Sequence, residues 1–424
     1  MARALTPQDC YALINSIAEQ ATGQTTLTAV DSSSFVSVGE LVLASGMENV
    51  VNSLSLVLGR TFIAVRPYEA KLKILNTIST DGYTSRMRKI SYYSRAAEAA
   101  GFENTQLYTN LAMGFDNGVN PDSQTPPQDQ STGSMWVQNQ PVPLEVNFAG
   151  SSVWDESTTV YEEQLKVAFR NEAEFASFVG GIMTEKGNDI ESAKEAFNRM
   201  TLLNFIAGIY DLNASTGSAI DLTAAYNAFA NPTPAATRAD LLPGGQYATE
   251  FREFFTAFFK GVSDKLENRS LKWHWSPTKT VNGVSYNLLR HTPKSKQRAI
   301  MFGPYYRDAQ ATIMPALFNP QYLDMGKQFE TVEFWQAEDS GAAIDVVPAI
   351  PDVNGQTQIA GSAVALDYVL GIIYDEDALM VDYQFEGSYS SPLEAKKLYR
   401  NIFWHYKKNA INDFTENAVL FYLG

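Results

Sequence analysis

The sequence predicts an α+β fold with more than one domain, and three observations support this. The chain has 424 residues, of which 45% are hydrophobic, so it can bury a substantial core. Apolar residues recur at helical spacing in residues 171–210 and 247–266. Short β-branched runs, separated by Pro, Gly and Asn, occur in residues 60–90 and 271–375. The chain is therefore expected to contain both helices and strands.

The first 59 residues are expected to form an arm of two short helices. Thr6, Pro7 and Asp9 give a capping hydroxyl, a proline where its missing N–H costs nothing, and an acid beside the helix dipole. Gly23 is a plausible stop for this helix. A Thr/Ser-rich connector is expected as far as Ser37, and a second helix over residues 46–58.

Residues 60–169 are expected to be mainly strands around a long loop. The runs TFIAVRPY (61–68) and KLKILNTI (71–78) favour strands. Residues 114–150 are rich in turn formers and have no periodicity, which predicts a long irregular excursion. The run VYEEQLKVAF (160–169) resembles a strand. A loop of this length is often functional, for example as a contact with a neighbouring subunit.

A long helical segment follows. Asn171, with Glu174 three residues later, predicts a capping box. One apolar stripe then ends near Gly187, and a second segment from Asn188 continues at helical spacing to about Tyr210. We expect these two segments to form one long, interrupted rod.

Residues 213–390 are predicted to be mixed α and β. A short helix is expected over residues 222–230, and the aromatic-rich segment 247–266 predicts a strong helix whose broad apolar face is packed core rather than a cofactor site. Strands are expected in five later runs, at residues 271–277, 283–290, 331–338, 342–350 and 365–375.

Charge and cysteine content limit the function. The formal net charge is −15 and the pI is about 4.7, so the chain has no general attraction for nucleic acid or anionic lipid. A container wall that merely encloses nucleic acid remains compatible with this charge. The single cysteine, Cys10, excludes an internal disulfide framework and suits a reducing cytoplasm. We expect Cys10 to be a small apolar residue in a helix, and we expect neither export nor a membrane span.

The sequence predicts no catalytic, cofactor-binding or metal-binding residues, and no cofactor. It contains no nucleophile elbow, phosphate-binding glycine loop or HExxH motif. The three histidines, His274, His291 and His405, lie far apart in sequence. His274 is expected on a strand, facing away from the tryptophans beside it, and both it and His405 are expected to be structural.

Two charged features have alternative interpretations. The acidic triplet Asp375, Glu376 and Asp377 could bind calcium, but a solvated turn at the start of a short helix is favoured because the EF-hand spacing is absent. Two basic runs could contact phosphate or acidic patches on sister subunits, or simply be solvated. These runs are Arg86, Arg88 and Lys89, and Lys294, Lys296 and Arg298.

Four passages resemble the major capsid proteins of tailed bacteriophages, nearest to short-tailed phages of the phi-twenty-nine kind. The passage SVGELVLASGMENVVNSLSLVLGRTFIAVRP resembles their arm-to-loop region, and FRNEAEFASFVGGIM resembles the start of their spine helix. VLGIIYDEDALMV resembles the last strand and short helix of their axial domain, and YRNIFWHYKKNAINDFTENAVLFYLG resembles the closing passage that returns to the peripheral domain.

This resemblance implies the Hong Kong ninety-seven type phage capsid fold, with an N-arm, an extended β-hairpin loop, a peripheral domain with a long spine helix, and an axial domain. The implied division is residues 1–59 for the N-terminal arm and 60–169 for the extended loop and flanking strands. Residues 170–212 and 391–424 would form the peripheral domain, and 213–390 the axial domain.

The resemblance also implies a function without enzymatic chemistry. The chain would self-assemble as hexamers and pentamers into an icosahedral shell enclosing packaged double-stranded DNA non-specifically, first in the host bacterial cytoplasm and finally in the virion. Implied partners are a scaffolding protein, a portal, and decoration or head fibre proteins, with no membrane. One alternative is an encapsulin-like nanocompartment shell protein. Another, supported only by the tryptophan-rich run WHW, is a carbohydrate-binding or enzymatic surface protein.

Overall fold

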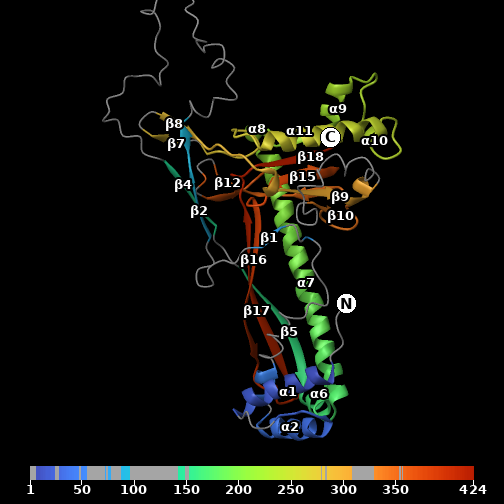
Figure 1. The fold of residues 1–424 in the computed structure, drawn as a ribbon, viewed down its shortest axis with the longest axis vertical. Helices are drawn as coiled ribbons and strands as arrows, with labels where there is room; N and C mark the ends of the chain where they lie inside the picture. Colours follow the sequence, from blue (N-terminus) through green and yellow to red (C-terminus); the bar gives the residue numbers. More distant parts are fainter. Residues whose placement is uncertain are drawn as a thin grey trace, which may run out of the picture.

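The fold is elongated, with one long helix running along most of its length (Figure 1). The computed structural model describes residues 6–23, 28–46, 49–54, 72, 75–77, 87–95, 142–148, 152–277, 279–281, 284–307, 329–352, 355 and 357–424. The labelled helices are α1 Pro7–Thr22, α2 Ser32–Ala44, α6 Glu162–Ala168, α7 Glu172–Asp211, α8 Asn213–Thr216, α9 Leu222–Ala230, α10 Arg238–Leu241 and α11 Ala248–Leu266.

The strands of the described residues fall into two larger sheets and four small ones. Strands up to β8 are β1 Asn76–Thr77, β2 Met87–Tyr92, β3 Ser94–Arg95, β4 Pro143–Phe148, β5 Ser152–Tyr161, β6 Ala219–Asp221, β7 Lys279–Val281 and β8 Val284–Asn287. The later strands are β9 Gln297–Phe302, β10 Phe329–Val332, β11 Ile344–Val346, β12 Ala349–Pro351, β13 Gln358–Ala360, β14 Val364–Leu366, β15 Val369–Asp375, β16 Leu379–Ser390, β17 Tyr399–Asn412 and β18 Ala418–Tyr422.

Helix α7 has 40 residues without a break, a length of about 60 Å at 1.5 Å per residue. The Asn171 side chain caps it by accepting from the Ala173 N–H at 3.1 Å, so the predicted start is confirmed, although the cap is not the expected capping box with Glu174. The predicted interruption near Gly187 is wrong. An interior glycine costs only about 1 kcal/mol relative to alanine, and packing at both ends of the helix outweighs that cost.

A four-stranded sheet in the order β1-β16-β17-β5 runs beside α7. Strand β17 has 14 residues and pairs with β16 on one side and β5 on the other, both antiparallel. Along most of β17 every second side chain is buried, which is the pattern of a sheet covered on one face. Ile402, Trp404 and Tyr406 lie on the buried face.

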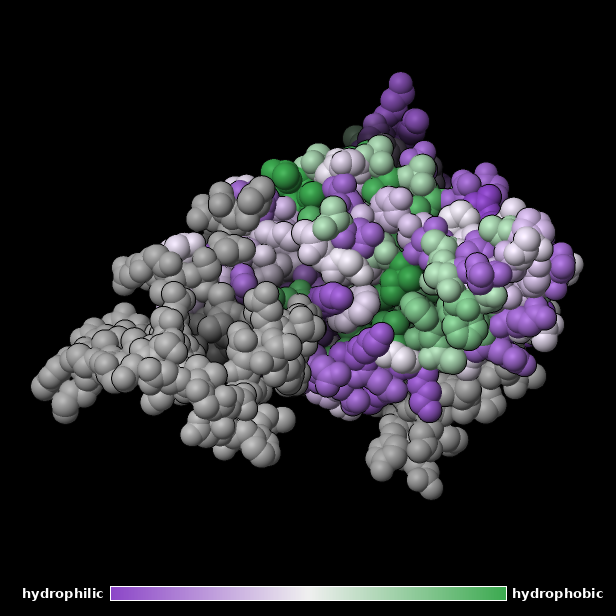
Figure 2. Space-filling model, turned by 90° about the horizontal axis from the view of Figure 1, so that it is seen from above, coloured by the Kyte–Doolittle hydropathy of each residue, from purple (hydrophilic) through white to green (hydrophobic). Residues whose placement is uncertain are grey.

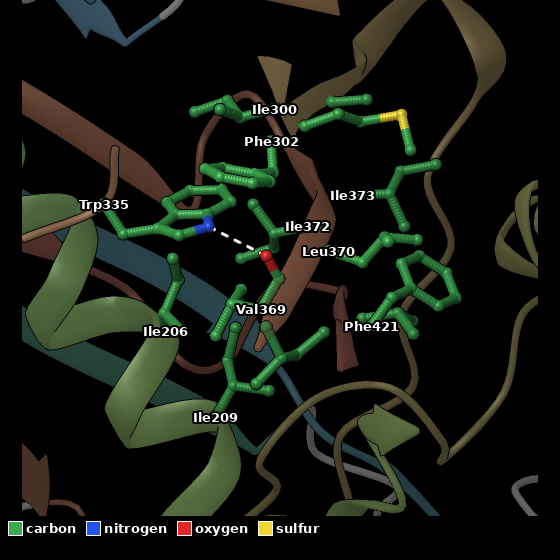
Figure 3. Close-up of a cluster of buried hydrophobic side chains, with 14 of the residues drawn as sticks. Ile206, Ile209, Ile300, Phe302, Trp335, Val369, Leu370, Ile372, Ile373 and Phe421 are labelled. Atoms are coloured by element: carbon green, nitrogen blue, oxygen red, sulfur yellow. Dashed lines mark hydrogen bonds between the residues drawn. The ribbon is translucent and has the colours of Figure 1, made fainter. Parts of the chain in front are cut away.

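A five-stranded sheet in the order β10-β9-β15-β18-β6 forms the core of the upper end of the molecule in Figure 1. All seven residues of β15 are buried, as expected for a strand with neighbours on both sides and cover on both faces. Figure 3 shows Trp335 lying among side chains from α7, β9 and β15, with its indole N–H donating to the Val369 carbonyl at 2.9 Å.

Helices α9, α10 and α11 lie at this upper end, and α11 packs against the five-stranded sheet. Phe255 and Phe259 of α11 contact Phe421 of β18, with ring centroids 5.9 and 5.2 Å apart. The predicted helices at 222–230 and 247–266, and the packed-core interpretation of the second, are confirmed. Seen from this end, the described surface mixes hydrophobic and hydrophilic areas (Figure 2).

The N-terminal helices pack at the opposite end, against the start of α7 (Figure 1). The predicted start of α1 is confirmed by a capping box between Thr6 and Asp9, and its end by Gly23 in the left-handed conformation. The connector expected as far as Ser37 is wrong, because Asp31 and Ser34 form a second capping box that begins α2. Within the second predicted helix, residues 49–54 are helical.

Five further expectations about local structure are wrong in whole or in part. Residues 162–168 form helix α6 rather than continuing a strand, because two acids occupy its first turn and Leu165 and Ala168 share its buried face. Residues 143–148, expected in an irregular excursion, form β4. Residues 271–277 contain no strand, and in 331–338 strand structure ends at Val332. Residues 376–378 form a turn into β16 rather than a short helix.

The remaining strand predictions agree in part. Strands occur within 283–290, 342–350 and 365–375. The expected strand at 61–68, and most of 71–78 and of 114–150, lie outside the described residues. The closing passage, expected to return to the peripheral domain, divides: β17 runs along α7, whereas β18 pairs with β15 in the five-stranded sheet.

Candidate subunit-contact surfaces

Strands β2 and β4 form a two-stranded antiparallel ribbon with two different faces. On one face Ser91 and Leu144 are buried; on the other, every described side chain is exposed. The exposed residues are Arg88, Ile90, Tyr92, Pro143, Glu145 and Asn147. An isolated two-stranded ribbon is at best marginally stable in water, so packing of its inner face against the subunit must hold it in place.

A network of charged side chains holds the inner face of the ribbon against the rest of the subunit. The Lys89 ammonium, on the inner face of β2, contacts the carboxylates of Asp413 and Glu416 in the turn between β17 and β18. The Arg290 guanidinium donates to the Ser91 hydroxyl at 2.8 Å and lies 3.3 Å from Glu416. The Lys89 and Arg290 side chains are each only 18% exposed, so their pairing with the two carboxylates is largely shielded from water. We call Lys89, Arg290, Asp413 and Glu416 the ribbon latch.

A groove of about 760 Å³ runs beside the middle of α7. One wall is α7 from Ser192 to Asn204, and the other includes Phe334 and residues 345–347. The Arg199 guanidinium lies 4.0 Å from the centre of the Phe334 ring and 3.1 Å from Glu195. The first contact holds the two walls of the groove together, and the second orients the Arg199 side chain. Met200 and Val347 line the groove although they are 57% and 59% exposed. We call this the α7 groove.

The second basic run and the acidic triplet face each other within one chain. Lys296 lies 3.0 Å from Asp377, Arg298 contacts Glu376, and Lys294 lies 2.6 Å from Asp264. The cations of this run therefore pair with acids of their own subunit, and the expected contact with sister subunits stays a prediction. In the first run, Arg88 pairs with Glu145 and Lys89 joins the latch, while Arg86 lies outside the described residues.

The expected solvated turn is correct for Glu376 and Asp377, which are partly exposed, but wrong for Asp375, which is buried. The Thr292 hydroxyl donates to its carboxylate at 2.8 Å, and the Asp377 N–H donates at 3.0 Å. Burial raises the pKa of Asp375, and these two hydrogen bonds partly oppose that shift. The side chain therefore organises the turn between β15 and β16.

His274 is buried, and its expected structural role is supported by its contacts. Its Nε2 atom lies 2.8 Å from the Leu288 carbonyl and its Nδ1 atom 3.0 Å from the Lys272 carbonyl, so the ring joins two irregular segments. Burial lowers the pKa of His274 below its ordinary value. His291 is exposed, and His405 lies beside the ring of Tyr389 on the uncovered face of the long sheet.

Other predicted features are distributed without forming a chemical site in the described part of the chain. Cys10 is buried in α1, as expected. Among the described residues no group of His, Cys, Asp or Glu is arranged to hold a metal ion. No described helix combines the length and hydrophobicity that crossing a bilayer requires.

The ribbon and the groove were missed by sequence reasoning. The ribbon carries only a partial signal: the alternation of Ile90 and Tyr92 with Lys89 and Ser91 indicates a strand, but it would place the apolar face inward, whereas that face is the exposed one. The groove carries none, because its two walls are more than 100 residues apart in the chain.

A family model described as "Phi29-like phage major capsid protein" matches residues 127–422, well over half of the chain. No curated protein matches the sequence. Among solved structures, a chain of the capsid of Staphylococcus phage Andhra has a TM-score of 0.50 and 11% sequence identity, and the match covers 84% of each chain.

Two other solved structures match with lower TM-scores. A chain from a structure of the head fiber and inner core protein gp22 of bacteriophage P68 has a TM-score of 0.45 and 13% identity, covering 84% of this chain and 86% of that one. A chain of the bacteriophage PhiM1 mature capsid has a TM-score of 0.38 and 11% identity, covering 84% and 87%. The Andhra likeness shows a tailed-phage capsid fold of the Hong Kong ninety-seven type, and the family match shows that the chain belongs to the Phi29-like phage major capsid proteins.

Proposed function

We propose that this capsid protein assembles as hexamers and pentamers into an icosahedral shell that encloses packaged double-stranded DNA. The observation that carries the proposal is the shape of the subunit: a long helix and sheet with a two-stranded ribbon latched to one side, whose outer face is left exposed. The exposed face of the ribbon adds little to the packing of a single subunit, whereas the subunits of a closed shell must contact one another. The role is structural and requires no enzymatic chemistry.

We propose a division of labour along the long axis. The N-terminal helices and the first half of α7, with the long sheet, would form the peripheral domain, and the five-stranded sheet with α9 and α11 would form the axial domain. The extended loop within residues 60–169 would overlie a neighbouring subunit. We also propose that the N-arm contacts another subunit; within the described residues, α1 and α2 pack against α7 of their own chain.

The net charge of −15 supports enclosure of DNA rather than binding to it. The described cations of both basic runs are engaged with acids of the same chain, which leaves them less available to phosphate. Proposed partners are a scaffolding protein, a portal, and decoration or head fibre proteins. Assembly would take place in the host bacterial cytoplasm, and the final location would be the virion.

Electron microscopy of the recombinant protein, alone and mixed with the scaffolding protein from the same phage, tests this proposal. We expect closed shells of uniform diameter in at least the mixture. Protein that remains a monomer at all concentrations, with and without the scaffolding protein, would refute the proposal.

A further inference from the structure

His274 is a buried side chain whose two ring nitrogens both face hydrogen-bond acceptors. Its Nε2 atom lies 2.8 Å from the Leu288 carbonyl oxygen, and its Nδ1 atom lies 3.0 Å from the Lys272 carbonyl oxygen and 3.2 Å from the Asn417 side-chain oxygen. A neutral imidazole carries a single N–H, so one of these nitrogens meets oxygen without a proton between them. An imidazolium ring donates at both positions without any movement of the ring.

The orientation of the Asn417 amide is set by hydrogen bonds on its other side. The Thr292 hydroxyl donates to the buried Asp375 carboxylate at 2.8 Å, so its oxygen accepts from the Asn417 side-chain N–H at 3.2 Å. The amide oxygen is therefore the Asn417 atom that faces His274. Thr292 and Asn417 are fully buried, so bulk water does not replace these partners.

The charged groups nearest the His274 ring belong to the ribbon latch. Arg290 comes from the segment at residues 288–290, which also supplies the carbonyl that faces Nε2. Glu416 and His274 line one small internal cavity, and they are the only titratable side chains among the described residues that line it. The Glu416 carboxylate lies 3.3 Å from Arg290 and also contacts Lys89 of the ribbon. Asp375 is more remote, at the far end of the hydrogen-bonded chain through Thr292.

A second proton on His274 disturbs the balance of charge in the latch. The two cations and two carboxylates of the latch carry no net charge. An imidazolium repels the Arg290 guanidinium and competes with it for Glu416, and both effects weaken the hold on the ribbon. Burial lowers the pKa of His274, and the Arg290 charge lowers it further, against the opposing charge of Glu416. Because coupling between two sites is reciprocal, a cation that disfavours the proton is itself disfavoured by it.

We propose that His274 is a proton-binding switch for the β2–β4 ribbon: the ring is neutral while the ribbon is latched, and proton uptake at acidic pH loosens the latch and frees the ribbon. The stability of the latched state is present at neutral pH and is lost as the pH falls through the lowered pKa of His274. A two-stranded ribbon without its latch is marginally stable, so its backbone should then exchange with solvent. The switch belongs to the single subunit, so its failure would leave the proposed function intact.

Hydrogen exchange of the unassembled, full-length subunit between about pH 7 and about pH 4.5 tests the switch. Exchange is expressed as protection factors, which remove the intrinsic pH dependence of the exchange reaction. Protection in β2 and β4 should fall at least about fivefold as the pH falls, while β15 stays protected. The C2–H signal of His274 in the proton NMR spectrum should titrate with the same midpoint. That signal is identified by elimination, with the variants His291→Asn and His405→Asn.

Two methionine variants on opposite faces of β2 test the electrostatic link without altering His274. Lys89→Met removes an ammonium that competes for Glu416, so the titration midpoint of His274 should rise by about 0.5 pH unit or more. Ribbon protection in this variant should already be low at neutral pH. Arg88→Met is the matched control, because it removes an exposed cation that pairs with Glu145 on the outer face, and it should leave the midpoint unchanged.

His274→Asn keeps a polar side chain that takes up no proton, so ribbon protection in this variant should be independent of pH over the same range. Constant protection of β2 and β4 in the unsubstituted chain would overturn the inference. A fall of equal size in His274→Asn would also overturn it, because the acid-sensitive group would then be a carboxylate. If His274→Asn does not fold, the methionine variants decide: equal midpoints of His274 in Lys89→Met and Arg88→Met would exclude the switch.

Discussion

The two hydrophobic clusters of this subunit are built in different ways around one shared helix. In the upper cluster, α7 is buried nearly all round, and residues 201–203 and 205–209 are all inaccessible. In the lower cluster, α7 contributes a single stripe that includes Phe175 and Val179, covered by α1 and α2. The upper cluster joins segments from the whole second half of the chain, whereas the lower one depends on a separate N-terminal piece.

One helix therefore belongs to two packing units, and we expect the upper unit to unfold more cooperatively than the lower one. The upper unit has a five-stranded sheet whose strands come from distant parts of the sequence, so removing any part exposes the rest. The lower unit can lose its N-terminal helices without unpairing β16, β17 and β5. We therefore expect core substitutions at the two ends to have different consequences.

The largest effect is expected from Trp335→Ala in the upper cluster. Trp335 is 1% exposed and loses both its packing and the hydrogen bond to Val369, so the free energy of unfolding should fall by about 3–5 kcal/mol. Urea denaturation followed by circular dichroism should show one transition shifted to lower denaturant. Met200→Ala, at an exposed position, should shift the denaturation midpoint little. A large shift for Met200→Ala would show that burial of the substituted side chain does not determine the loss of stability.

The next effect is expected from Phe35→Ala in the lower cluster. Phe35 is fully buried and packs edge-on against Phe175 at 5.6 Å, so the loss should be about 3 kcal/mol. Because the lower cluster is a separate unit, we expect limited proteolysis to cut first within residues 6–54 while the upper cluster stays protected. Loss of both ends in one transition, as for Trp335→Ala, would remove the distinction between the two clusters.

A smaller effect is expected from Lys89→Met, which breaks the ribbon latch. The change leaves Asp413 and Glu416 without their ammonium partner, and partial exposure limits the cost to about 2 kcal/mol. Hydrogen exchange should rise in β2 and β4 and remain unchanged in β15. Arg88→Met removes an exposed ion pair on the other face of the same strand and should cost less than about 1 kcal/mol. Equal exchange in the two variants would argue against the latch.

The smallest effect is expected in the pH dependence of the upper cluster. Burial lowers the pKa of His274 in the folded state, whereas the pKa of the same side chain in the unfolded chain is about 6.5. The stability that depends on neutral His274 is therefore present above about pH 6.5 and is lost as the pH falls through the lower, folded-state pKa. His274→Asn should lose less stability between pH 7 and pH 5 than the unsubstituted chain. Parallel urea midpoints for the two proteins over this range would contradict the assignment.

Much of the helical structure was predictable from local sequence. The start of α7 at Asn171, the whole of α9 and nearly all of α11 follow from caps and apolar spacing. Residues 162–168 show where this reasoning fails. Because residues 160–169 follow directly on β5 they suggest a continuing strand, but the chain turns into helix α6 beside the start of α7. The residues of α6 do not by themselves indicate that α7 will lie next to them.

The sequence by itself determined the start and extent of the long helix, the aromatic core helix and the likeness to capsid proteins, because each depends on residues close together in the chain. It also determined the acidic balance, which is a matter of composition alone. Tertiary structure alone decided that α1 and α2 pack against α7, that β18 joins the five-stranded sheet, and that Lys89 meets two carboxylates more than 300 residues away. The physical reason is that burial and ion pairing depend on which distant segments pack together, and local periodicity does not indicate which segments these are.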